Sequence, residues 1–338
     1  SGIARASSCI ARAIRSAASV CAQSRPPARS TASAVRAMPS LSPVMYGFPY
    51  SAASSAAAGV PETSAATTGR DFLRAARSAP AGVPVRAQLP GSDPVCLAEH
   101  AARLAGLGPA GIDLNFGCPA RTVNRHGGGA SMLQDPENIA RLVAAVRRAV
   151  PTHLPVSAKM RLGFEDKSLA LENALAIAEG GASALAVHAR TKVEGYEPPA
   201  HWIWVRKIRD AVAIPVIANG DVFTLQDYLA IRQESGCERI MLGRGAVMRP
   251  DLARQIRQYT QGGAVQEADF TEIMGWIRLF FDLCLAKEAN NKYPVARLKQ
   301  WLGMMKRVYP QAQEVFEGIR TLKEADEVKR VLAQFVFD

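Results

Sequence analysis

Residues 111–129 read GIDLNFGCPARTVNRHGGG, in which an apolar strand runs into a loop with one cysteine, one proline and three consecutive glycines. We expect the strand to end before Cys118, because Pro119 has no backbone N–H with which to continue regular pairing. At the carboxyl end of a parallel strand in an α/β barrel, a thiol lies on the rim where catalytic residues gather. The glycines at 127–129 allow backbone shapes that are closed to other residues, so the loop could close over a ligand. Two interpretations stay open on these residues alone: a catalytic thiol, and a buried cysteine beside a flexible turn.

The alternation of strand and helix around this stretch continues along the middle of the chain. Apolar runs of strand length are separated by amphipathic segments such as residues 137–150 and 169–181, and the second of these ends in the Gly-Gly typical of a helix end. Strands that alternate with helices predict a parallel sheet, and six such units favour a TIM-type (β/α)8 barrel over a small open fold. A complete barrel has eight strands, so we expect the first two to be missing or replaced. The six runs are 83–89, 111–116, 155–161, 184–190, 214–220 and 239–244.

Beyond about residue 260 the strand pattern gives way to four helical segments, which predict a small helical bundle after the barrel. The second segment carries several basic side chains together with Trp301 and Tyr309. Such a helix suits contact with an RNA backbone, and a solvated face over core aromatics is the alternative. The four segments are 268–289, 293–310, 311–322 and 324–335, and the basic residues are Arg297, Lys299, Lys306 and Arg307.

The composition is that of a globular protein in which basic residues outnumber acidic ones. The 338 residues are 48% hydrophobic and 21% charged, which is enough to bury a large core. The formal net charge of +11 favours a polyanionic partner and argues against an acidic one. Residues 1–80 contribute +7 of that charge, with nine Arg, no Lys, one Asp and one Glu, so an RNA-binding hypothesis depends on the later part of the chain.

The six cysteines show neither a C-x-x-C pair nor a cysteine–histidine spacing suited to zinc, so we expect no metal site. This cysteine usage fits a reducing compartment, the cytoplasm. No apolar run approaches the roughly 20 residues that a membrane-spanning helix needs. We therefore expect a cytoplasmic protein without membrane association, and a monomer.

Residues 1–78 are rich in Ala, Ser, Arg and Pro and lack both helical and strand periodicity. Three interpretations are open for this low-complexity segment: a disordered tail, an organelle transit peptide, or the translation of a shifted or wrongly joined reading frame. The third follows from the abrupt change near Ala79 to well-patterned sequence. The predicted domains are therefore this segment (1–78), a barrel domain over residues 79–260 and a helical domain over residues 261–338.

Almost every predicted strand ends in a polar or charged residue, which a purely structural sheet does not require. Glycine beside a polar group at the last two strand ends, in N-G-D (219–221) and G-R-G (243–245), is typical of barrel sites that bind a phosphate. Lys159 suits a position against a ring system that becomes anionic on reduction. The strand-end residues are Gln88, Asn115, Cys118, Lys159, Arg161, His188, Arg190, Asn219, Gly220, Asp221, Gly243 and Arg244.

The run NFGCPARTVNRHGGGASMLQDPENI (115–139), followed by KMRLGF, VHARTK, PVIANGD and MLGRGA in this order, resembles the tRNA-dihydrouridine synthases. The resemblance covers roughly residues 80–338. It implies a TIM barrel that binds FMN, with tRNA as the substrate and NADPH as the hydride donor. The tail ARLKQWLGMMKRVYP (296–310) is similar to the subfamily that reduces uridine 16 of the tRNA D loop.

The resemblance implies a role for each strand-end residue. FMN reduced by NADPH would pass a hydride to C6 of the uracil, and Cys118 would donate a proton to C5 from the opposite face. A thiol is largely protonated near neutral pH, as a proton donor must be. The implied flavin residues are Gln88, Lys159, His188, Asn219, Gly220, Asp221, Gly243 and Arg244. The implied substrate residues are Asn115, Arg161 and Arg190 near the uracil, and Arg297, Lys299 and Lys306 on the tRNA.

The sequence departs from this family at its beginning. Family members start with a strand ending in a motif like A-P-M-E-G and a second strand ending in T/S-E-F, and residues 1–80 contain neither. A barrel two strands short would have unpaired edges and an incomplete flavin site. The alternative function is therefore a catalytically inactive chain that retains at most tRNA binding. A third candidate is a flavin barrel that acts on free dihydropyrimidines, against which the basic tail argues.

Overall fold

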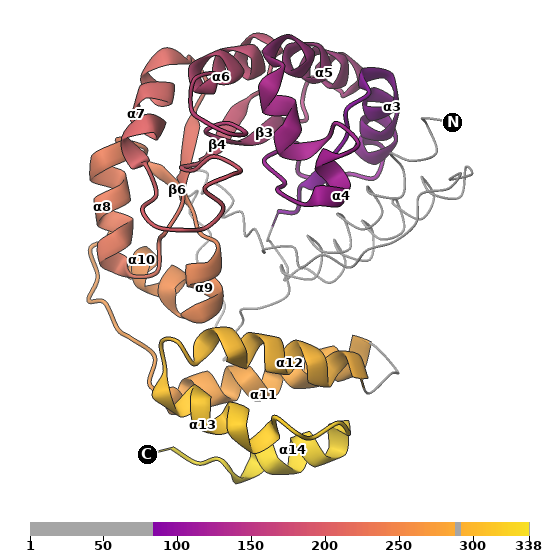
Figure 1. Ribbon diagram of the computed structural model, residues 1–338. Helices are drawn as coiled ribbons and strands as arrows, with labels where there is room; N and C mark the ends of the chain where they lie inside the picture. Colours follow the sequence, from indigo (N-terminus) through magenta and orange to yellow (C-terminus); the bar gives the residue numbers. More distant parts are fainter. Residues whose placement is uncertain (1–83, 288–291, 338) are drawn as a thin grey trace, which may run out of the picture. The chain divides into compact units, whose positions relative to one another are not determined.

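The structure is a computed structural model that describes residues 84–287 and 292–337 (Figure 1). Its contacts divide the chain into two compact units. The sheet unit holds the described residues up to Asp221 together with Ala230–Leu242. The helical unit holds Val222–Leu229 and the residues from Gly243 onward. The predictions about residues 1–78 lie outside the described residues.

The core of the sheet unit is a parallel six-stranded sheet in which each strand pairs with the next along the chain. Sequential order, with a helix between successive strands, is the arrangement of a TIM-type (β/α)8 barrel, and the predicted fold class is confirmed. The segment in which the first two strands were expected to be missing or replaced lies outside the described residues. The strands are β1 (Ala87–Leu89), β2 (Ile112–Phe116), β3 (Val156–Arg161), β4 (Ala184–His188), β5 (Val216–Asn219) and β6 (Arg239–Met241).

The two faces of the sheet differ in chemistry, because side chains alternate along a strand. One face is apolar: Leu114 and Phe116 of β2 and Met160 of β3 are almost completely buried. Burial of an apolar side chain of this size contributes about 1.5–3 kcal/mol. Helices cover this face, and Figure 1 shows α3, α5, α6 and α7 in an arc around the strands. Their bounds are α3 (Pro94–Ala105), α5 (Pro136–Ala149), α6 (Ala170–Glu179) and α7 (Trp202–Ala211).

Local sequence signals fix the ends of these helices. Asp93 and Asp135 each accept a hydrogen bond from the backbone N–H three residues later, at 2.7 and 3.0 Å, and each is followed by a proline that begins the helix. Helix α6 is followed by Gly180 and Gly181, and Gly181 has a φ of +92°, a left-handed conformation that favours glycine. The outer layer of the sheet unit is therefore specified by its own caps as well as by packing.

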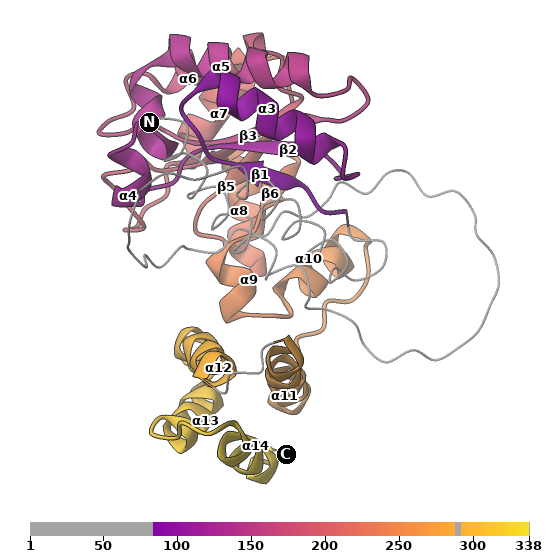
Figure 2. The same cartoon turned by 90° about the vertical axis from the view of Figure 1, so that its right-hand side faces the viewer.

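The helical unit is built around α11 to α14, which lie at four corners when viewed nearly end-on in Figure 2. Ile277, Leu298 and Val315 are fully buried in their common core. Trp301 Nε1 donates to the carbonyl of Val247 at 2.8 Å, which fastens α12 to α9. The helices are α9 (Arg244–Met248), α10 (Leu252–Thr260), α11 (Phe270–Lys287), α12 (Lys292–Met305), α13 (Pro310–Ile319) and α14 (Ala325–Gln334), while α8 (Leu225–Ser235) has residues in both units.

The predicted helical bundle is thus confirmed. The predicted domain boundary between residues 260 and 261 stays a prediction. By their contacts, α9 and α10 belong to the same unit as the helices that follow them. Of the helices in the described ranges, none is both long and apolar enough to cross a bilayer.

Candidate active site

The polar face of the sheet brings together the strand-end residues of β1 to β5. Residues that pair across parallel strands project to the same side of the sheet. Gln88 of β1 joins this set, because Asn115 Nδ2 donates to its Oε1 at 2.9 Å. The register pairs are Asn115 with Lys159, Arg161 with His188, and His188 with Asn219.

Cys118 lies two residues beyond the end of β2, in a turn whose backbone is firmly held. Its carbonyl oxygen accepts hydrogen bonds from Asn124 Nδ2 at 2.9 Å and from Ala130 N at 3.1 Å. Asn124, which ends α4 (Arg121–Asn124), also accepts from Ser131 N at 2.8 Å through its Oδ1. One amide thus joins the cysteine backbone to the short helix that begins at the third glycine, while the side chain of Cys118 stays partly exposed.

Gly129, the third glycine and the first residue of a 3₁₀ helix (Gly129–Gln134), packs directly against this turn. Its φ is +64°, and a Cβ added to it would lie 2.8 Å from the carbonyl oxygen of Cys118 and 3.0 Å from its Cβ. Glycine at this position therefore permits both the left-handed backbone and the close approach to Cys118.

Gly129→Ala is expected to displace the Cys118 turn and to lower the free energy of unfolding by about 1–3 kcal/mol. The added Cβ would clash with the carbonyl oxygen of Cys118, and alanine is strained in a left-handed backbone. Gly128→Ala is the matched control, since Gly128 has a φ of −102° and its added Cβ would come no closer than 3.3 Å to a neighbouring atom. Thermal unfolding and the rate of Cys118 alkylation by iodoacetamide measure the two effects. Equal results for both variants would contradict the role given to Gly129.

Lys159 lies half-buried beside the Cys118 turn. Burial, followed by the charge of Arg161, lowers the pKa of Lys159 to about 8, and the charges of Asp113 and Cys118 act against this. Its ammonium group has no hydrogen-bond or ion-pair partner among the described residues. A half-buried ammonium group without a hydrogen-bond or ion-pair partner in the described residues suits an electron-rich or anionic group of a ligand.

Arg161 is only 2% exposed and holds two loops together. Its Nε donates to the carbonyl of Gly117 at 3.0 Å, and its Nη1 donates to the carbonyls of Thr191 and Gly195, each at 2.9 Å. The guanidinium also lies 5.2 Å from the ring centroid of Tyr196. Arg161 therefore ties the turn that precedes Cys118 to the loop that follows β4.

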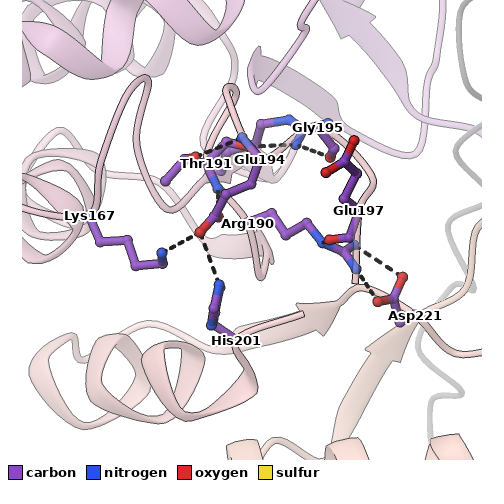
Figure 3. Close-up of polar contacts among 9 residues, drawn as sticks. Lys167, Arg190, Thr191, Glu194, Gly195, Glu197, His201 and Asp221 are labelled. Carbon is purple, nitrogen blue, oxygen red and sulfur yellow. Dashed lines mark hydrogen bonds and ion pairs between the residues drawn. The ribbon is translucent and has the colours of Figure 1, made fainter. Parts of the chain in front are cut away.

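Arg190 is completely buried and forms a two-point ion pair with Asp221 (Figure 3). Nη1 donates to Asp221 Oδ1 at 3.1 Å, Nη2 donates to Oδ2, and Nε donates to the carbonyl of Glu197 at 2.5 Å. Asp221 has a φ of +52°, which is uncommon for a residue other than glycine, and the ion pair holds it there. The predicted contacts of Arg161 and Arg190 with uracil stay predictions, and in this structure both guanidinium groups hold loops.

Glu194 organises the loop between β4 and α7, as Figure 3 shows. Its Oε1 accepts from Lys167 Nζ and lies 2.9 Å from His201 Nε2, and its Oε2 accepts from Thr191 N at 2.7 Å. Burial acts to raise the pKa of Glu194, but these hydrogen bonds and the charges of Lys167 and His201 lower it to about 2. The carboxylate thereby joins the loop after β3 to the loop after β4.

Glu194→Gln is expected to lower stability at neutral pH and to have less effect as the pH falls from about 4.5 towards 2. The folded-state pKa lies below that of the unfolded chain, so the carboxylate contributes stability above the unfolded value and loses it as the pH falls through the folded value. The measurement is the difference in unfolding free energy between wild type and variant at several pH values. A difference that does not change with pH would contradict the account.

His188 and Asn219 end their strands on the same polar face, and His188 is almost fully buried. Asn219 Nδ2 donates to the carbonyl of Met241 at 2.7 Å, which ties β5 to β6. Gly220 has a φ of +133°, and its carbonyl accepts from Trp202 Nε1 at 2.9 Å. The backbone after β5 is thus fixed in a shape that requires glycine.

The other predicted cofactor residues, Gly243 and Arg244, lie in the helical unit at the start of α9. The guanidinium of Arg244 lies 5.5 Å from the ring centroid of Phe223, which belongs to the same unit. An added Cβ at Gly245 would lie 1.8 Å from the carbonyl oxygen of Val222, so only glycine fits there.

The three cations predicted to contact tRNA lie on or just after α12, and each has a partner within the bundle. Arg297 Nη1 donates to Gln300 Oε1 at 2.9 Å. Lys299 Nζ donates to two carbonyls just after α13, at 2.9 and 2.5 Å, and burial followed by a nearby lysine lowers its pKa. Lys306 Nζ lies 4.3 Å from the ring centroid of Phe316. Their contact with tRNA stays a prediction.

Three residues that organise the site were not predicted from the sequence. Asp113 is 1% exposed, and burial raises its pKa, against hydrogen bonds from Gln88 and Ser157. The alternation in I-D-L-N-F could have indicated this role, because it places Asp113 on the same face of the strand as Asn115. The three residues are Asp113, Asn124 and Glu194.

Across residues 84–287 and 292–337, no group of three His, Cys, Asp or Glu side chains is placed to hold a metal ion.

Comparison with known proteins identifies relatives over most of the chain. Residues 60–337 match the model of a family described as Dihydrouridine synthase (Dus), and the match includes residues 60–78, which carry none of the motifs quoted above. The tRNA-dihydrouridine(16) synthase of Neisseria meningitidis serogroup A / serotype 4A is 63% identical over 254 residues, which cover 75% of this chain and 76% of that protein. The tRNA-dihydrouridine(16) synthase of Pseudomonas putida is 50% identical over 262 residues, which cover 78% of this chain and 80% of that protein.

Proposed function

This chain belongs to the dihydrouridine synthase family, and we propose that it reduces uridine 16 of tRNA to 5,6-dihydrouridine, with bound FMN as the cofactor and NADPH as the reductant. The observation that carries the proposal is the polar face of the sheet unit, where the Cys118 turn lies beside Lys159, a half-buried cation without a partner among the described residues. A relative named for position 16 is 63% identical, which supports the choice of uridine.

The side chains on this face fit a flavin. Lys159 supplies a positive charge, and Gln88 and His188 supply polar side chains on the same face, which together suit an electron-rich ring. Bound FMN supplies hydride chemistry, by which electrons from NADPH reach the C5–C6 double bond of uracil. The proposal keeps the residues predicted for the ribityl chain and the phosphate, which are Asn219, Gly220, Asp221, Gly243 and Arg244.

Cys118 is proposed to donate its Sγ proton to C5 of the uracil, on the face opposite the flavin. Its turn suits this role, because hydrogen bonds from Asn124 and Ala130 hold the backbone and leave the side chain partly exposed. Asn115 is proposed to lie beside the base. Arg161 and Arg190 are proposed to lie near the uracil as well, and both hold loops that border the same polar face.

The helical domain, residues 261–338, is proposed to bind the tRNA. Arg297 and Lys299 on α12, and Lys306 directly after it, support this. A uridine stacked within a folded tRNA cannot be reached in place, so it must be turned out of the stack into the site. A monomer in the cytoplasm completes the proposal.

The relatives give no support to the alternative of a catalytically inactive chain, since each is named as a synthase. The alternative of a barrel that acts on free dihydropyrimidines gains no support either, because those relatives are named for tRNA.

The proposal is tested by the flavin absorbance of the purified chain and by NADPH oxidation with an unmodified tRNA transcript. We expect a bound flavin and oxidation that depends on the tRNA. Lys159→Met is expected to weaken FMN binding by about 10- to 100-fold, because a hydrogen bond from a charged group contributes about 1.5–3 kcal/mol.

Lys207→Met is the matched control for that variant. Lys207 lies on the outer helix α7, with its ammonium 4.2 Å from the ring centroid of Trp204, and its loss should leave FMN binding unchanged. A chain that cannot be reconstituted with FMN, or equal FMN affinity in wild type and Lys159→Met, would contradict the proposed site.

A further inference from the structure

A row of hydrogen bonds in the sheet unit leads from a buried carboxylate to the turn that carries Cys118. Gln88 Nε2 donates to Asp113 Oδ2 at 2.7 Å, and Asn115 Nδ2 donates to Gln88 Oε1 at 2.9 Å. The backbone N–H of Gly117 then donates to Asn115 Oδ1 at 2.9 Å. We name these four residues, Asp113, Gln88, Asn115 and Gly117, the amide relay. Gln88 and Asp113 are register partners of β1 and β2, so the sheet itself fixes the first step.

With Asp113 as a carboxylate, each step of the amide relay has only one chemically allowed direction. A carboxylate accepts hydrogen bonds and donates none, so the amide nitrogen of Gln88 must face Asp113 and its oxygen must face Asn115. Asn115 must then present its nitrogen to Gln88 and its oxygen to Gly117. Without the carboxylate both amides could turn over, and Asn115 would present an NH₂ group to the N–H of Gly117, which places two donors face to face.

The polar partners of Asp113 act against the burial that raises its pKa. Its second oxygen accepts from Ser157 Oγ at 2.7 Å, and Arg86 Nη1 donates to that hydroxyl oxygen at 2.9 Å, which directs the hydroxyl proton towards Asp113. Both carboxylate oxygens therefore receive a donor. Burial raises the pKa of Asp113, and these hydrogen bonds together with the charges of Arg86 and Lys159 oppose that rise.

We propose that Asp113 is a positioning residue that acts through the amide relay, fixing which way the Gln88 and Asn115 amides point and thereby holding the turn that presents Cys118. The relay connects Gln88, on the flavin side of the proposed site, to Asn115 beside the uracil. Its effect on turnover rests on the proposed function, whereas its effect on the turn does not.

Asp113→Asn tests the relay without a change of size. We expect the rate of Cys118 alkylation by iodoacetamide, read by mass spectrometry of the Cys118 peptide from the full chain, to rise by about 3- to 10-fold, as expected for a lost hydrogen bond. We expect kcat to fall by a similar factor, with the KM for tRNA unchanged.

Ser157→Ala is the matched control, because it removes the other hydrogen-bond partner of Asp113 and leaves the carboxylate that sets the direction. It should alkylate Cys118 at the wild-type rate. A wild-type alkylation rate in Asp113→Asn, or equal changes in both variants, would overturn the proposal. A wild-type chain without turnover would count against the proposed function alone, since alkylation is measured without substrate.

Exchanging the side chains of Asp113 and Asn115, which lie on either side of Gln88, distinguishes the direction of the hydrogen bonds from the loss of one contact. Asn115→Asp alone puts carboxylates on both sides of Gln88, whose amide has a nitrogen on one side only. In the double variant Asp113→Asn with Asn115→Asp, a turned-over Gln88 satisfies every group, and residue 115 still accepts from Gly117. We expect this double variant to be more thermally stable than Asn115→Asp and to alkylate Cys118 near the wild-type rate. Additive losses across the double-mutant cycle would overturn the relay.

Discussion

Cys118→Ala is expected to slow uridine reduction by about 10²- to 10⁴-fold, which is the usual contribution of a positioned proton donor. The variant should still fold and retain FMN, because Asn124 and Ala130 hold the turn through the carbonyl of Cys118 and not through its side chain. The measurement is the rate of dihydrouridine formation under single-turnover conditions, together with the FMN content of the purified variant.

Two further variants sharpen this test. Cys118→Ser keeps the size and polarity of the side chain, but a hydroxyl group is a far weaker acid than a thiol, so we expect it to be slow as well. Cys237→Ala changes a cysteine that is 3% exposed and should react at the wild-type rate. A serine variant as fast as wild type would show that position 118 needs only a polar group, and would contradict proton donation.

Arg190→Met is expected to lower the free energy of unfolding by about 3–5 kcal/mol, as expected when one partner of a buried ion pair is removed. Arg190 is completely buried, and the variant deprives Asp221, at a φ of +52°, of the two-point contact that holds its backbone. Because the chain has two units, hydrogen exchange in the loop after β4 is a better measure than a global unfolding midpoint.

The helical unit supplies a matched control with the same geometry and less burial. Arg254 contacts Glu272 through two hydrogen bonds, at 2.6 and 3.0 Å, and the two side chains are 37% and 40% exposed. Arg254→Met should lower the free energy of unfolding by no more than about 1 kcal/mol. Equal losses for the two variants would mean that burial does not govern the contribution of Arg190.

The fold could be predicted from the sequence because its signals are local. Each of the six strands is a short apolar run, and helices α3 and α5 begin at an Asp-Pro pair that caps the first turn. Within the described residues, the first strand is shorter than the predicted run: it spans Ala87–Leu89, although the carbonyl of Val85 already accepts from Ala110 N at 2.8 Å. Cys118 was placed at a strand end by the same reasoning, and it lies there.

The partners of the charged side chains could not be predicted, because they depend on loop geometry. The strand pattern placed Arg161 and Arg190 at strand ends, but not the backbone carbonyls around Arg161 or the carboxylate that Arg190 meets 31 residues away. Lys299 was predicted to face RNA, and it also binds carbonyls just after α13. Asp113 was treated as part of an apolar strand, although its polar character and its alternation with Asn115 pointed to the site face.

Nucleoside mapping of an unmodified tRNA transcript, after incubation with this chain, FMN and NADPH, tests the central claim most directly. The account predicts 5,6-dihydrouridine at position 16 with the wild-type chain and almost none with Cys118→Ala. A wild-type chain that carries FMN but forms no dihydrouridine, or forms it only at another position, would contradict the account.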